Sequence, residues 1–98
     1  MRYPDLNRYI SNSMLKAGII SNTDLFRKVE GHMGHEFMRL IVNGEKLPEA
    51  EKAKILAKAL GVDYAEFLCA IENARFKDRG IAFFVRAVPT KQLEGAPK

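Results

Sequence analysis

The sequence predicts an all-α fold of five short helices, followed by a C-terminal extension that contains one candidate strand. Apolar side chains recur every three or four residues in five successive stretches, and glycines separate most of these stretches. Two Ser/Asp-x-x-acidic patterns also mark helix starts. We expect residues 1–76 to form the helical domain and residues 77–98 to form the extension.

The first two helices have clear start and stop signals. Proline is tolerated in the first turn of a helix, so we expect one helix to run from Pro4 until Gly18 stops it, with Leu6, Tyr9, Ile10 and Met14 inward. Ser21 and Asp24 form a capping box for the second helix, which Gly31 closes. Its inward residues would be Leu25, Phe26 and Val29.

The third helix is expected from His35 to Val42, with Phe37, Met38 and Ile41 toward the core and Gly44 as its left-handed terminator. Pro48 would start the fourth helix and Gly61 would end it. Its inward stripe would be Ala53, Leu56, Ala59 and Leu60, with Lys52, Lys54 and Lys58 in solvent.

A second capping box, Asp63 with Glu66, opens the fifth helix. Its buried side would consist of Tyr64, Phe67, Leu68, Ile71 and Ala74. The segment that follows, Ile81–Val88, is rich in strand formers and ends at Pro89, and residues 90–98 resemble a flexible tail. Two interpretations of this apolar segment remain open: a strand that pairs with a second subunit, or a stretch that folds back over the first and fifth helices.

Composition restricts the class of protein. Of the 98 residues, 47% are hydrophobic and 29% are charged, as in an ordinary globular domain. The longest apolar run, residues 81–85, is too short for a membrane span, and the single cysteine fits a reducing compartment. We therefore expect a cytoplasmic protein without a membrane partner.

The charge balance favours a nucleic-acid partner only weakly. The net charge is +4 and the pI is about 9.4, but residues 21–48 hold four basic and four acidic side chains. The basic excess lies near the two ends of the chain. Electrostatic attraction of the protein to DNA phosphates would thus have to come largely from those ends.

The sequence contains few features that would indicate catalysis or metal binding. His32, His35 and Glu36 lie close in sequence and Cys69 could join them, but no established zinc-ligand spacing is present. The chain also has no Gly-rich phosphate loop and no nucleophile elbow. We expect no metal, no cofactor and no enzymatic activity, with Cys69 as a small buried apolar residue of the fifth helix.

Residues 21–64 resemble the lambda-repressor or Cro-like helix-turn-helix family, also called the xenobiotic-response-element family. Ser21-Asn22-Thr23-Asp24-Leu25 is similar to the family's start of helix two, and Ile41-Val42-Asn43-Gly44 to its end of helix three. Leu56-Ala57-Lys58-Ala59-Leu60-Gly61-Val62 is similar to its helix four. The match covers a little under half the chain.

The resemblance implies a sequence-specific DNA-binding transcription regulator, working as a homodimeric repressor of phage or bacterial type. Its base-reading positions fall on His35, Glu36, Arg39 and Leu40. Arg39 could donate two hydrogen bonds to guanine, Glu36 could accept from cytosine, His35 could donate to guanine or phosphate, and Leu40 could contact a thymine methyl. Asn22, Asn43 and Lys46 complete the expected DNA-binding set.

Simpler interpretations exist for the same residues. Arg39 and Glu36 could be solvated charges, Leu40 a core residue, and Asn43-Gly44 only a helix terminator. Two departures from the family also bear on the site: Phe26 stands where a small alanine is usual, and two extra residues lie within Glu30–Gly34. An alternative function is therefore a protein-interaction module, including an antitoxin that binds a toxin.

Overall fold

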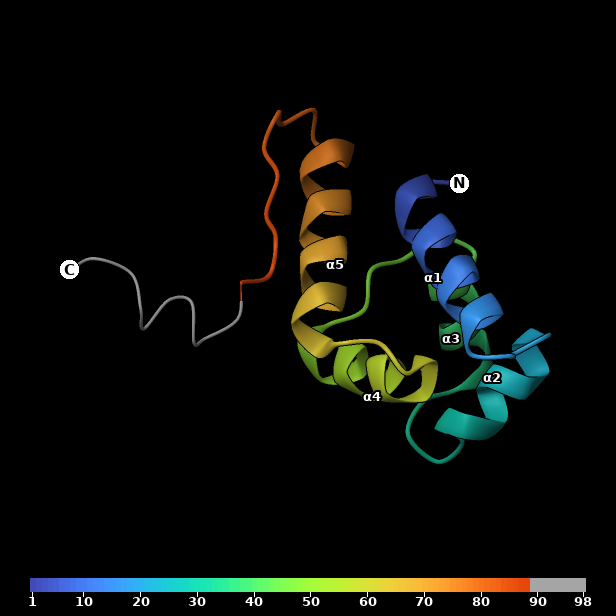
Figure 1. Cartoon of the computed structure of the whole chain (residues 1–98). Coiled ribbons are helices and arrows are strands. Elements are labelled where there is room, and N and C mark those ends of the chain that lie inside the picture. The colour runs from blue at the N-terminus through green and yellow to red at the C-terminus, as the bar shows by residue number, and fades with distance from the viewer. Residues whose placement is uncertain (89–98) are drawn as a thin grey trace.

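A computed structural model describes residues 1–88 and contains five helices in that range (Figure 1). They are α1 (Pro4–Lys16), α2 (Asn22–Val29), α3 (His35–Val42), α4 (Ala50–Leu60) and α5 (Tyr64–Asp78). The predicted all-α, five-helix fold is confirmed, and residues 1–88 contain no strand. The expected tail, residues 90–98, lies outside the described residues.

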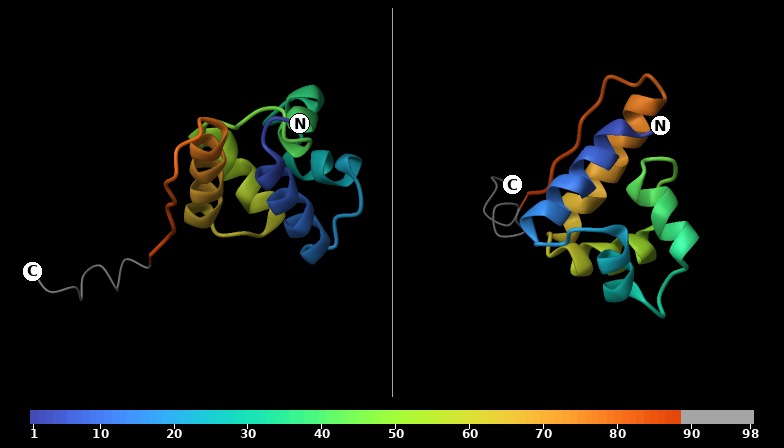
Figure 2. Two further views of the ribbon diagram at one scale, coloured as in Figure 1. Left: turned by 90° about the horizontal axis from the view of Figure 1, so that it is seen from above. Right: turned by 90° about the vertical axis from the view of Figure 1, so that its right-hand side faces the viewer.

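All five helices contribute to one core. α1 and α5 lie side by side, α4 crosses below them, and α2 and α3 lie on the far side of α1 (Figures 1 and 2). The largest fully buried side chains come from every helix and include Leu6, Leu25, Met38, Leu56 and Phe67. Among the described residues, no helix has the length and apolar character that a bilayer crossing requires.

Both predicted capping boxes form their first hydrogen bond. The Ser21 hydroxyl accepts from the Asp24 backbone N–H at 3.2 Å, and the Asp63 carboxylate accepts from the Glu66 N–H at 3.0 Å. The predicted start of α4 was wrong by two residues, because Pro48 is fully buried in the preceding loop and Glu49 is the N-cap. The helix therefore begins only at Ala50.

The end of α3 is held against the start of α1 by two short hydrogen bonds. The Tyr3 backbone N–H donates to the Gly44 carbonyl at 2.7 Å, and the Asn7 side-chain amide donates to the Val42 carbonyl at 2.7 Å. Gly44 has φ +72°, and a Cβ there would lie 2.7 Å from the Tyr3 carbonyl oxygen. Only glycine fits this close approach.

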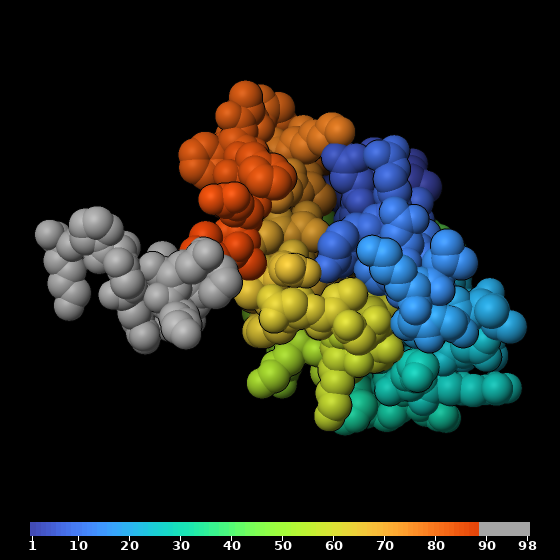
Figure 3. All heavy atoms as spheres, viewed as in Figure 1, coloured from blue at the N-terminus to red at the C-terminus, as the bar shows by residue number. Residues whose placement is uncertain are grey.

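The C-terminal extension folds back along α5, as Figures 1 and 3 show. The Asn73 side chain donates to the Val85 carbonyl at 2.9 Å and accepts from the Val85 N–H at 2.7 Å, and Phe83 contacts Phe76 edge-on. Phe84 and Tyr9 of α1 line one shared cavity. Residues 81–88 form no strand in this single chain, and the segment lies along α5 as the fold-back interpretation expects. Phe83 and Phe84 remain 63% and 73% exposed, so pairing of this segment with a second subunit stays a prediction.

The contact at Gly44 yields a stability prediction with a matched control. Gly44→Ala adds left-handed strain of about 1–2 kcal/mol and a clash with α1 that costs about 1–3 kcal/mol more. Gly61→Ala introduces the same strain at φ +70°, but nothing lies within 4 Å of its new methyl group. Urea denaturation should show the larger loss for Gly44→Ala. Equal losses would contradict a close-packed junction between α1 and α3.

Candidate nucleic-acid interface

The third helix has a buried side and an outward side. Met38, Ile41 and Val42 are buried, which anchors α3 in the core. His35, Arg39 and Asn43 follow one another at the four-residue spacing of a single helix face, with Glu36 and Leu40 beside them. His35 and Glu36 are exposed and Arg39, Leu40 and Asn43 are half-buried. We call this set of five residues the α3 face.

The two charges of the α3 face are paired with each other. Arg39 Nε donates to Glu36 Oε2 at 3.0 Å, and a second guanidinium nitrogen contacts the other carboxylate oxygen. The hydrogen bond from Arg39 lowers the pKa of Glu36 below its ordinary value, and the same bond raises the pKa of Arg39. The α3 face is therefore electrically neutral while still presenting one cation and one anion.

The two extra residues before α3 lie in the loop that precedes it. α2 ends at Val29, so the extra residues lengthen the loop, residues 30–34, and do not extend the helix. The Lys52 ammonium donates to the His32 carbonyl and thereby ties this loop to α4. The expectation that Lys52 is simply solvated was therefore wrong.

Phe26 lies between α2 and the first residue of α3. Its half-buried ring contacts the His35 imidazole edge-on, with ring centres 4.9 Å apart. A phenylalanine can occupy this position because its ring packs under His35 instead of separating the two helices further. The contact limits how freely the His35 side chain can turn toward a ligand.

The other expected DNA-binding residues lie around the α3 face. Asn22 is the first residue of α2, and Asn43 is the C-cap of α3. Lys46 follows α3, and its ammonium lies 4.8 Å from the centre of the Phe37 ring. Phe37, expected in the core, is only half-buried and packs against the edge of the core. The seven residues thus come from α2, α3 and the segment after α3.

The candidate metal ligands are not gathered into a site. His32 lies in the loop before α3, His35 and Glu36 on the first turn of α3, and Cys69 on α5. Among residues 1–88, no three His, Cys, Asp or Glu side chains come together as metal ligands. Cys69, expected as a small buried residue of the fifth helix, does lie on α5 but is only half-buried, and it lines a surface cavity next to the extension.

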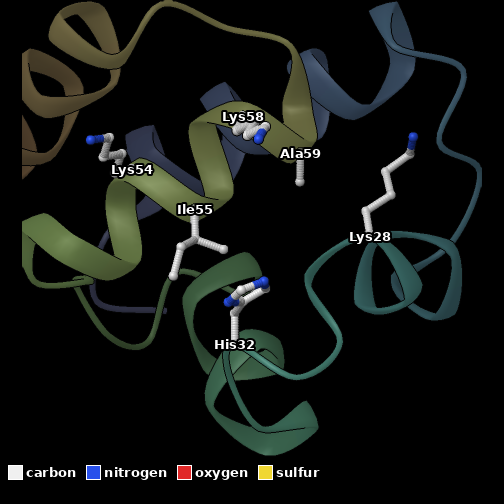
Figure 4. A pocket seen from close by; sticks show the side chains of 6 residues that line it. All are labelled: Lys28, His32, Lys54, Ile55, Lys58 and Ala59. Atoms are coloured by element: carbon white, nitrogen blue, oxygen red, sulfur yellow. The ribbon is translucent and has the colours of Figure 1, made fainter.

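Sequence reasoning missed a basic groove between α2, the loop and α4. Lys28, His32, Lys54 and Lys58 line it together with Ile55 and Ala59, and its volume is about 460 Å³ (Figure 4). The one sequence feature that pointed to this groove was the four-residue spacing of Lys54 and Lys58, which places them on one face of a helix. We call these six residues the basic groove.

The N-terminal basic residues contribute less free charge than the sequence suggested. Arg2 forms an ion pair with Asp78 at 3.1 Å, and Asp5 accepts from Lys77 at 2.8 Å. The Lys77 hydrogen bond lowers the pKa of Asp5, so this carboxylate stays ionised. Among the described residues, Arg2 and Arg8 are therefore ion-paired, whereas the three lysines of the basic groove take part in no close ion pair.

No family model, curated protein or solved structure matches this chain. The helix-turn-helix resemblance consequently rests on its three short segments within residues 21–64.

The ion pair on the α3 face yields a prediction about pH. The pKa of Glu36 is lowered, so the pair stabilises α3 above the ordinary value of 4.5 and this contribution is lost as the pH falls through the lower folded value. An NMR titration of the Glu36 carboxyl carbon should give a midpoint below 4.5, and Arg39→Ala should raise it toward 4.5. Arg8→Ala, a control on α1, should leave the midpoint unchanged. A midpoint insensitive to Arg39→Ala would show that the pair does not form.

Proposed function

We propose that this protein is a sequence-specific double-stranded DNA-binding transcription regulator that reads operator half-sites through α3. The observation that supports this most is the combination of an anchored inner side of α3 with an outward face bearing His35, Glu36 and Arg39. A recognition helix needs both properties, since its side chains must meet base edges while its backbone is held rigidly.

The paired charges suit discrimination between bases. In a G·C-containing step, the Arg39 guanidinium can donate to guanine O6 and N7 while Glu36 accepts from a cytosine amino group. Where the major groove presents only acceptor atoms opposite Glu36, such as guanine O6 and N7, its carboxylate is repelled. This arrangement gives little non-specific affinity and places most of the binding energy on the correct site.

Contacts with the sugar-phosphate backbone of DNA would come from residues around the α3 face. Gly34, the N-cap of α3, provides no side-chain cap, so the first amides of the helix are available to a phosphate oxygen. Asn22, Asn43 and Lys46 can donate further hydrogen bonds to the sugar-phosphate backbone. These contacts set the position of the helix but do not identify a base.

A complete operator requires two subunits, because one recognition helix covers only one half-site. We therefore propose a homodimer that binds half-sites about one helical turn apart and represses by occupying promoter DNA. Selection of bound duplexes from a random pool should yield a palindromic consensus.

DNA binding should weaken as the salt concentration rises and should depend on Arg39. Loss of one bidentate contact to guanine costs about 1–3 kcal/mol, so Arg39→Ala should weaken binding to the selected duplex roughly 5- to 150-fold. Fluorescence anisotropy at several salt concentrations measures both effects. Arg8→Ala removes the same charge from α1, where Arg8 is also paired with an acidic residue, and serves as the control.

Two outcomes would contradict the proposal. Equal losses for Arg39→Ala and Arg8→Ala would mean that only net charge matters. Absence of binding even at low salt would favour the alternative function, a protein-interaction module on the same scaffold.

A further inference from the structure

The basic groove has two walls, one formed by α2 and the loop and the other by α4. Lys28 comes from the last turn of α2 and His32 from the loop, and α4 lies across from them (Figure 4). Ile55 and Ala59, both half-buried, point from α4 into the groove and give it an apolar floor, and Lys54 and Lys58 lie beside them at its edge. Lys52 fixes the position of the loop wall through its hydrogen bond to the His32 carbonyl.

The lysines of the groove form no close ion pair within residues 1–88. None of the ion pairs in this part of the chain includes Lys28, Lys54 or Lys58, and no acidic side chain lines the groove. Three lysines around one groove raise the positive potential there. Such a surface is complementary to negative charge.

The apolar floor narrows the choice of anionic partner. A DNA duplex is a convex rod whose phosphates would meet the lysine ends and leave Ile55 and Ala59 in water. A protein segment can instead insert an apolar side chain between the walls and direct carboxylates toward them. The volume of about 460 Å³ is large enough for such side chains.

We propose that the basic groove binds an acidic amphipathic helix of a partner protein. Lys54 and Lys58 are one helical turn apart, so they match carboxylates at the same spacing on the incoming helix, while Lys28 and His32 meet the opposite flank. None of the residues that line the groove belongs to α3. The proposal therefore does not depend on DNA binding by the α3 face.

Three fluorescently labelled probes test this proposal on the full-length protein. The first is a synthetic helical peptide with leucines along one face and glutamates beside them. The second has the same glutamates but serine at every leucine position, and the third is a mixed-sequence DNA duplex. Anisotropy at low salt should show binding of the first peptide that exceeds binding of the second at least about tenfold.

Two variants locate the binding site. The double variant Lys54→Glu/Lys58→Glu should lower the affinity for the leucine peptide at least about tenfold. The control Arg8→Glu/Lys16→Glu makes the same change of charge on α1 and should change this affinity less than about twofold. Ile55→Ser should lower the affinity for the leucine peptide and leave the affinity for the serine peptide unchanged. Circular dichroism confirms that each variant is folded.

Three results would overturn the proposal. They are absence of peptide binding at low salt, equal affinity for the two peptides, and equal losses from the groove and control double variants. A comparable loss of duplex affinity in Lys54→Glu/Lys58→Glu would also overturn it and would assign the groove to DNA phosphates. Failure of a duplex selected from a random pool to bind would contradict the proposed DNA-reading function without affecting the peptide result.

Discussion

The contact between Gly44 and the start of α1 is the constraint on which the rest of the structure depends. Because Gly44 has no side chain, the Tyr3 backbone can reach its carbonyl group, and Asn7 can reach that of Val42. These bonds fix the C-terminal end of α3, while Met38 and Ile41 fix its inner side in the core. The direction in which His35, Glu36 and Arg39 project is therefore determined by packing and not by the loop before α3.

The two candidate surfaces differ in how their charges are arranged. On the α3 face, Arg39 and Glu36 are bonded to each other. Binding is therefore favourable only when the ligand offers hydrogen-bond partners to both side chains in place of their ion pair. In the basic groove the lysines have no acidic neighbour among the lining residues, so any suitable anion gains from binding. The first arrangement favours selectivity over affinity, and the second favours association with an oppositely charged partner.

The parts of the fold that depend on local chemistry could be predicted from the sequence. The positions of the five helices were predicted from the capping boxes at Ser21 and Asp63 and from the five amphipathic stretches. This was possible because those interactions span only a few residues. The sequence left two interpretations of the extension open, since the bonds from Asn73 to Val85 that hold it along α5 join residues on separate segments. The basic groove was missed for a similar reason: counting charges along the chain does not reveal that Lys28 and Lys54 lie on facing walls. The α3 face was predicted because a single helix positions its residues.

The most direct test of the account is a map of the DNA-contacting surface by NMR. A duplex selected from a random pool would be titrated into the isotope-labelled protein, and changes in backbone amide signals would be followed residue by residue. The account predicts the largest changes in residues 35–43, together with the Arg39 side-chain signal. Changes confined to α5 or residues 81–88, with α3 unaffected, would contradict the claim that this helix reads DNA.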